Sequence, residues 1–161
     1  MKIKTKPYGE IEVNEKQKLH FSEGIIGFEE ISHYYLIDSK EGPFYWLQAA
    51  EEPELAFLFV DPRIFMNNYK LEVKKSDLAS LNLDSNDDLL DFAIITVPED
   101  HLKISVNLMG PIVINRKTRE AKQVISENDQ YTVKHYIIEE IKKQKEKLVE
   151  KEDARSYTAT Q

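Results

Sequence analysis

The sequence predicts a mainly β fold: an antiparallel single domain with a few short helices and a charged C-terminal helical tail. Short apolar runs, many of them β-branched or aromatic, alternate with brief turns, which is typical of an antiparallel meander. The length of 161 residues suits one domain with a substantial core. Past residue 138 the composition changes to an almost continuous run of Lys and Glu. We therefore expect a folded domain at residues 1–138 and a tail at residues 139–161.

The first part of the chain is expected to consist of strands. Residues 2–6 and 10–14 alternate polar and apolar side chains around a Pro-Tyr-Gly-Glu turn, so they are predicted to form a hairpin. Further strands are expected at residues 19–21, 31–37, 44–49 and 55–60. The paired glycines Gly24 and Gly27 indicate a turn rather than a phosphate-binding loop, because the other residues of such loops are missing.

The next part is more mixed. Residues 69–73 alternate like a half-exposed strand, and residues 76–81 are predicted to form a short helix with Ser76 as its N-cap. A second capping signal begins at Ser85. Strands are then expected at residues 89–97 and, as the last strand, at residues 131–138.

A hairpin at residues 106–126 is predicted to organise the rest of the domain. Ile112, Val113 and Ile114 form a continuous β-branched run, which suits a strand buried on both faces. The preceding Gly110-Pro111 pair indicates a bulge, a bend or an edge position. Residues 116–119 are polar enough for the hairpin loop, and residues 121–126 return as the partner strand.

The tail is predicted to be a frayed helix. Glu139 stands four residues before Lys143, which supports a helix, but the segment has few apolar residues to dock against the domain. The final Ser-Tyr-Thr-Ala-Thr-Gln is expected to be disordered.

Charge and composition narrow the class of function. The formal net charge of −7 argues against direct nucleic-acid binding and suits either a basic protein partner or simple solubility. The chain has no cysteine, so disulfides and thiolate chemistry are excluded. We found neither a signal peptide nor an apolar run of the ~20 residues needed to span a membrane, which predicts a cytoplasmic protein with no membrane partner.

No motif for catalysis, cofactor binding or metal binding is present. The four histidines lack the helical spacing of zinc proteases, and a structural or surface role is favoured over a metal site assembled across the fold. We therefore predict no enzyme activity, cofactor or metal. Among the aromatic residues, Trp46 and Phe57 are expected to fill the core, and Tyr45 is a candidate surface contact.

Several motifs in register resemble the family of the flagellar assembly factor FliW. They are Phe21-x-x-Gly24-x-x-Gly27-Phe28, Phe44-x-Trp46-Leu47-Gln48, Pro53-x-Leu55-Ala56-Phe57, Val60-Asp61-Pro62, Asn107-Leu108-x-x-Pro111-Ile112-Val113-Ile114-Asn115 and Gln123-Val124. The resemblance covers about residues 1–138, and the charged extension departs from the shorter members of the family.

The resemblance implies an antiparallel, barrel-like, non-enzymatic cytoplasmic regulator with two protein partners. One implied partner is flagellin, and the other is CsrA, a dimeric RNA-binding protein that represses flagellin translation. Capture of CsrA away from its RNA-binding surface would be noncompetitive and would relieve that repression. The alternatives are a flagellin-protecting secretion chaperone without a translational role, and a small-ligand-binding β-barrel or an enzyme.

Candidate partner-binding residues follow from the motifs and the charge pattern. Asn107, Asn115 and Gln123 are candidates near a working surface, with buried strand capping as the alternative. Glu51, Glu52 and Glu54 are candidates for meeting a basic partner, with a solvated loop as the alternative. Tyr45 completes the set. We expect a monomer, although an exposed edge strand would allow self-pairing.

Overall fold

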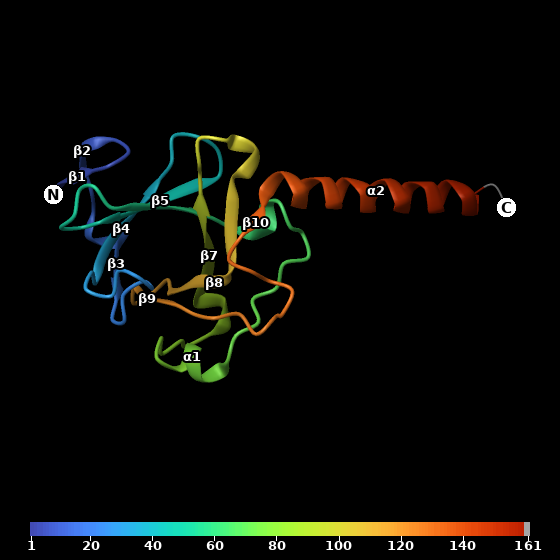
Figure 1. Cartoon of the computed structure of the whole chain (residues 1–161). Coiled ribbons are helices and arrows are strands. Elements are labelled where there is room, and N and C mark those ends of the chain that lie inside the picture. The colour runs from blue at the N-terminus through green and yellow to red at the C-terminus, as the bar shows by residue number, and fades with distance from the viewer. Residues whose placement is uncertain (160–161) are drawn as a thin grey trace.

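A ring of seven strands forms the centre of the computed structural model, which describes the backbone of residues 1–159 and the side chains of residues 1–149 (Figure 1). The sheet order is β10-β8-β7-β6-β5-β4-β3-β9, and β9 pairs in turn with β8, which closes the ring. The strands are β3 (Lys18–Phe21), β4 (His33–Asp38), β5 (Phe44–Ala49), β6 (Ala56–Val60), β7 (Leu89–Thr96), β8 (Ser105–Asn115), β9 (Glu120–Gln123) and the short β10 (His135–Tyr136). The prediction of a mainly β, antiparallel, barrel-like domain is confirmed.

One pairing in the ring is parallel. β3 and β9 run in the same direction, with His20 opposite Glu120 and Phe21 opposite Ala121. The other neighbours in the ring are antiparallel. β10 pairs with the beginning of β8, along the edge that β9 occupies further on.

The inside of the barrel is filled by one apolar cluster. Alternate residues of each strand point inward because successive side chains of a strand face opposite sides of the sheet. The buried members are Leu19, Phe21, Ile25, Tyr34, Leu47, Ala49, Phe59, Ile112, Ile114 and Ala121. Val113 points outward and is also fully buried, against Leu81 and Val124. The β-branched run of β8 is therefore buried on both faces, as predicted.

Three covers protect parts of the outer face. The hairpin of β1 (Lys2–Thr5) and β2 (Gly9–Glu12) packs over β4 and β5. Residues 71–83, which include α1 (Lys75–Ala79), pack over β8 and β9. Residues 65–69 and 131–137 pack over β6, β7 and β8. Short 3-10 turns lie in the connections: η1 (Glu15–Gln17), η2 (Pro62–Ile64), η3 (Asn86–Asp88) and η4 (His101–Lys103).

The predicted irregularity at Gly110-Pro111 is a bulge within the continuous strand β8. Phe92 lies opposite Ile112, whereas Ile94 lies opposite Asn107, so β8 carries extra residues between these two pairs. Pro111 has no N–H for the ladder, and its carbonyl accepts a hydrogen bond from the N–H of Val124 at 3.0 Å.

Three local predictions differ from the structure. Residues 69–73 form no strand; Leu71 and Val73 pack against the outer face of the barrel instead. Lys74, not Ser76, is the N-cap of α1, and it makes no side-chain capping bond. The predicted strand at residues 131–138 is reduced to β10. The prediction for Ser85 is confirmed, because its hydroxyl caps η3 by accepting a hydrogen bond from Asp87 N–H.

The charged tail forms one long helix, α2 (Ile137–Ala159), which extends away from the barrel (Figure 1). The helix begins two residues before the predicted start of the tail at Glu139. It also continues into the segment for which disorder was expected, since its backbone is helical through Ala159. Thr160 and Gln161 lie outside the described residues.

A buried hydroxyl inside the barrel gives a first prediction. Tyr34 is fully buried, and its hydroxyl has no hydrogen-bond partner among the described residues. Burial raises the pKa of Tyr34 from 10.0 to about 12. Removing this unsatisfied group in Tyr34→Phe should raise the free energy of unfolding by about 1 kcal/mol in urea denaturation.

The same substitution should change the alkaline stability. Below pH 10 the Tyr34 phenol is protonated in both states, and between pH 10 and about 12 only the unfolded state ionises, which favours unfolding. Tyr34→Phe should remove this part of the loss of stability. It should also remove the phenolate absorbance that Tyr34 contributes at a higher pH than an ordinary tyrosine. A substantial destabilisation by Tyr34→Phe would show that the hydroxyl has a partner in solution.

Candidate functional site

The strand directions gather several loops at one end of the barrel, which we call the loop end. Here β3, β5, β7 and β9 finish, and β4, β6 and β8 begin. The connection between β3 and β4, residues 22–32, crosses this end and is called the plug loop. Its Ile25 is buried in the inner cluster, and the ring of Phe28 meets Phe57 of β6 edge to face at 5.2 Å.

The plug loop depends on a glycine with a left-handed backbone. Gly24 has φ +69°, and a Cβ on it would lie 2.5 Å from the Cα of Glu29. Further along, the N–H of Gly27 donates a hydrogen bond to the Glu29 carboxylate at 3.0 Å. This bond lowers the pKa of the Glu29 carboxyl from its ordinary value.

Two of the predicted polar residues meet at the bulge of β8. The side-chain oxygen of Asn107 accepts the N–H of Gly110 at 2.9 Å. The amide of Gln123 donates to the carbonyl of Gly110 at 3.0 Å and accepts the N–H of Ile26 at 2.9 Å. A Cβ on Gly110 would lie 2.9 Å from Gln123 Nε2. Asn107 and Gln123 therefore fix the bulge and tie the plug loop to β9.

An exposed apolar patch surrounds this junction; it comprises Ile26, Phe28, Met109 and Ile125. Ile26 is 63% exposed, Met109 is 41% exposed and Ile125 is 48% exposed. A hydrogen bond of 2.8 Å from Ser126 N–H to the Met109 carbonyl keeps Ile125 beside Met109. Exposed apolar groups gathered at one place are typical of surfaces that bind other proteins.

Acidic side chains stand at the same end of the barrel as the apolar patch. Glu51, Glu52 and Glu54 are exposed on the β5–β6 loop at the loop end. A hollow of about 280 Å³ is lined by Glu51 and Glu52 together with Glu30 of the plug loop. We call Glu29, Glu30, Glu51, Glu52 and Glu54 the acidic rim.

Gln48 supports the β5–β6 loop and was not among the predicted site residues. Its side chain is fully buried on the outer face of β5. Nε2 lies 3.1 Å from the carbonyls of Glu52 and Leu55, to which it donates. Oε1 accepts the N–H of Lys6 at 2.8 Å, which links the loop to the amino-terminal hairpin.

The structure places the other two predicted residues at the opposite end. Asn115 ends β8, is 2% exposed, donates to the Leu81 carbonyl at 2.8 Å and accepts the N–H of Lys117 at 3.0 Å. These contacts are the ones expected if Asn115 caps the end of a strand, which was the alternative to a partner-binding role. Tyr45 is half-buried, faces the inner cluster and meets Phe92 edge to face at 5.4 Å.

The apolar patch was missed by sequence reasoning. Its signal was the segment Gly24-Ile25-Ile26-Gly27-Phe28, an apolar stretch inside a loop. Within the described part of the chain, His, Asp and Glu side chains form no group of three placed to hold a metal ion. None of the described helices has the length and apolar character required to cross a membrane.

Comparisons with known proteins point in one direction. A family model described as FliW protein matches residues 2–137. A Ruminiclostridium cellulolyticum protein named Flagellar assembly factor FliW is 41% identical over 146 residues, which cover 89% of this chain and 99% of the relative. A protein of the same name from Leptospira biflexa is 43% identical over 139 residues, covering 85% of this chain and 91% of the relative.

A solved structure agrees with these relatives. The crystal structure of a flagellar assembly factor FliW superposes with a TM-score of 0.78 at 35% sequence identity, covering 85% of this chain and 96% of the other. The family match ends at Ile137, the first residue of α2.

The plug loop gives a prediction with a matched control. In Gly24→Ala the new Cβ meets the backbone of Glu29, so the free energy of unfolding should fall by about 2–4 kcal/mol. Gly27→Ala, whose Cβ enters open space at φ +90°, should cost only about 1 kcal/mol. Urea denaturation of both variants measures the difference. Equal losses would show that the close approach of Gly24 to Glu29 is not maintained in solution.

Proposed function

Because the chain belongs to the FliW family of flagellar assembly factors, we propose that it acts in the cytoplasm as a non-enzymatic regulator that binds flagellin and CsrA. Binding of CsrA would relieve its repression of flagellin translation. Flagellin and CsrA would exchange on the protein, so that export of flagellin frees it to capture CsrA.

The apolar patch with its acidic rim is the observation that supports capture of CsrA. An RNA-binding protein carries a positive charge because it contacts phosphates, so a cluster of carboxylates attracts the whole molecule at long range and speeds encounter without having to contact its RNA-binding surface. The apolar side chains of Ile26, Phe28 and Met109 supply area that loses water on contact, which gives affinity. The overall charge of −7 acts in the same direction.

The noncompetitive character of the proposed antagonism follows from where each protein is held. If CsrA is captured away from its RNA-binding surface, RNA and this protein do not compete for the same residues, and the effect passes through a change in CsrA. Exchange with flagellin requires that one partner lowers the affinity for the other, and this coupling is reciprocal.

A secretion chaperone that only protects flagellin is the second candidate. Nothing in a chaperone role requires the acidic rim, which is why regulation through a basic partner is preferred. A small-ligand-binding barrel has less support, since the inner cluster of aromatic and aliphatic side chains fills the barrel.

Titration calorimetry tests the exchange. The purified protein should release or absorb heat on titration with CsrA from the same organism, and the signal should be lost or much reduced when flagellin is already bound. Binding of flagellin without binding of CsrA would favour the chaperone. Absence of a binding signal with both CsrA and flagellin would contradict the proposed function.

Charge reversal tests the acidic rim. Glu51→Lys, Glu52→Lys and Glu54→Lys combined should weaken CsrA binding by about tenfold or more at low salt, mainly through slower association. The side chains are exposed, so stability should change little.

A control variant carries the same change of charge elsewhere. Glu10→Lys, Glu15→Lys and Asp84→Lys combined alter exposed side chains outside the loop end. Surface plasmon resonance at several salt concentrations should show nearly normal association for this control. Equal loss in both triple variants would mean that net charge matters and the rim does not.

A further inference from the structure

The three covers leave a gap on the outer face of the barrel. Between the amino-terminal hairpin and the cover formed by residues 131–137, an apolar hollow of about 440 Å³ remains over β5, β6 and β7. Its walls include Trp46, Leu58, Ile95 and Val97, and Val97 is 51% exposed.

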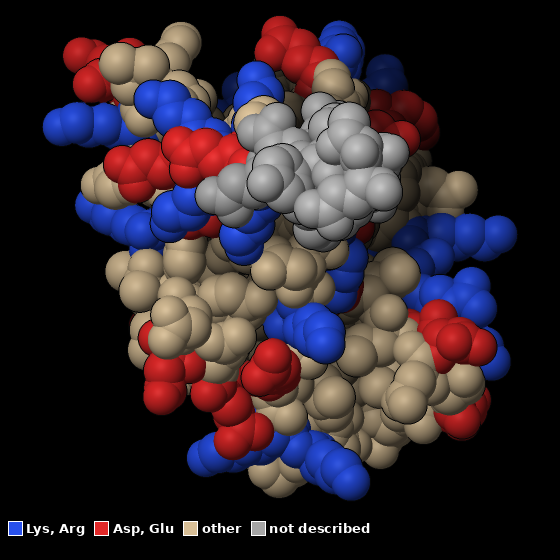
Figure 2. Space-filling view, turned by 90° about the vertical axis from the view of Figure 1, so that its right-hand side faces the viewer, with Lys and Arg blue, Asp and Glu red and all other residues tan. Residues whose placement is uncertain are grey.

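The hollow continues along α2. A second hollow of about 500 Å³ shares Phe44 and Ile137 with the first and runs between the barrel and the helix as far as Leu148. Its other apolar walls are Pro43, Val60, Ile64, Phe65 and Ile141. We call the two together the α2 trough. Figure 2 views the molecule from the side on which α2 extends and shows uncharged surface with both basic and acidic side chains around it.

The α2 wall of the trough has the spacing of a helix-binding seam. Ile137, Ile141, Gln144 and Leu148 follow one another at intervals of four, three and four residues, which places them on one face of the helix as in a coiled coil. At about 1.5 Å per residue this face is roughly 16 Å long. A second α-helix with apolar residues at the same intervals can pack along this face of α2.

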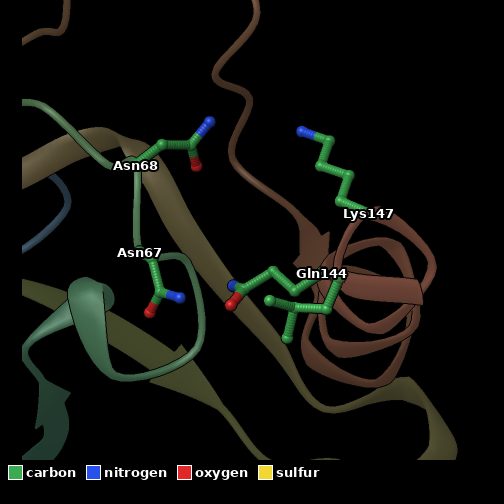
Figure 3. A pocket seen from close by; sticks show the side chains of 5 residues that line it. Asn67, Asn68, Gln144 and Lys147 are labelled. Atoms are coloured by element: carbon green, nitrogen blue, oxygen red, sulfur yellow. The ribbon is translucent and has the colours of Figure 1, made fainter. Parts of the chain in front are cut away.

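Gln144 interrupts the seam with a polar group. Figure 3 shows it extending from α2 beside Lys147, opposite the loop that carries Asn67 and Asn68. Its Nε2 is buried without a hydrogen-bond partner among the described residues. This atom is buried in the free protein and faces a separate hollow lined by Asn67, Asn68 and Lys147, so the contact with a partner falls to the apolar residues of the seam.

Charge sets the direction of the bound helix. Glu41 and Ser39 line the trough at the β5 end, and Lys145 lines it at the α2 end. Lys142 lies one turn before Lys145 on α2. Since the amino end of a helix is partly positive and its carboxyl end partly negative, the preferred orientation places the carboxyl end beside Lys145.

We propose that the α2 trough binds one amphipathic helix of a partner protein, with its apolar seam against Ile141 and Leu148 and its carboxyl end toward Lys145. The inference rests on the proposed function, within which flagellin is the partner for the trough. CsrA is assigned to the acidic rim because a basic protein suits carboxylates, whereas lysines suit the negative end of a helix. The trough and the acidic rim have no residue in common and are thus separate surfaces.

Trp46 provides a direct reporter, because it is the single tryptophan of the chain and lines the trough. Titration with purified flagellin of the same organism, which must itself lack tryptophan or be corrected for it, should shift the Trp46 emission. In Val97→Glu and in Ile141→Glu, flagellin should bind about tenfold more weakly or worse, and CsrA should bind normally. Both positions are partly exposed, so the variants should fold.

Two further variants complete the design. Lys145→Glu should weaken flagellin binding through repulsion, and this surface change keeps the test valid if a trough variant fails to fold. Val133→Glu alters an exposed apolar residue that does not line the trough and should bind normally. Circular dichroism melting confirms the fold of each variant.

The outcomes separate the two proposals. If the wild-type protein binds flagellin and every trough variant binds it with the same affinity, the proposal that the trough holds flagellin is overturned. The proposed function would still stand. Loss of CsrA binding in place of flagellin binding would also overturn it, since the trough would then hold the other partner. Failure of the wild-type protein to bind flagellin would overturn the proposed function, and the trough inference with it.

Discussion

Closure of the barrel by β9 is the constraint on which the other features depend. β9 fits between β3 and β8, parallel to the first and antiparallel to the second, and His20 Nδ1 lies 2.9 Å from the Glu120 carboxylate at this seam. A closed ring leaves its member strands without a free edge between them. The direction of β9 also brings Gln123 to Gly110 and to Ile26, so the same pairing that completes the fold creates the loop end.

The sequence predicted the ring strands and the amino-terminal hairpin well and the strands at residues 69–73 and 131–138 poorly, for a physical reason. Residues in the ring combine β-branched or aromatic runs with turn residues, and both signals belong to the pairing itself. Residues 69–73 and 131–138 show similar alternation because their apolar side chains pack on the outer face of the barrel. Alternation reports which side of a segment is buried, and it does not show whether the backbone is paired.

The candidate site was predicted in part. Asn107, Gln123 and the glutamates of the β5–β6 loop were identified from motif and charge, and the structure brings them to one end. The apolar patch was missed because exposure of Ile26 or Met109 depends on how distant segments meet. The positions of two aromatic side chains depend on the alternation along β5. Tyr45 faces the inner cluster and Trp46 faces the outer side of the barrel, because neighbouring residues of a strand point to opposite sides.

The hydrogen bond from Ile26 to Gln123 joins residues 97 positions apart in the chain. A growing polypeptide that has not yet produced β9 therefore has neither the closed ring nor the anchored plug loop. Contacts over such separations also form slowly, because a long loop must be closed first. The loop end, with its apolar patch and acidic rim, is thus completed only after β9 has been synthesised and has paired with β3 and β8.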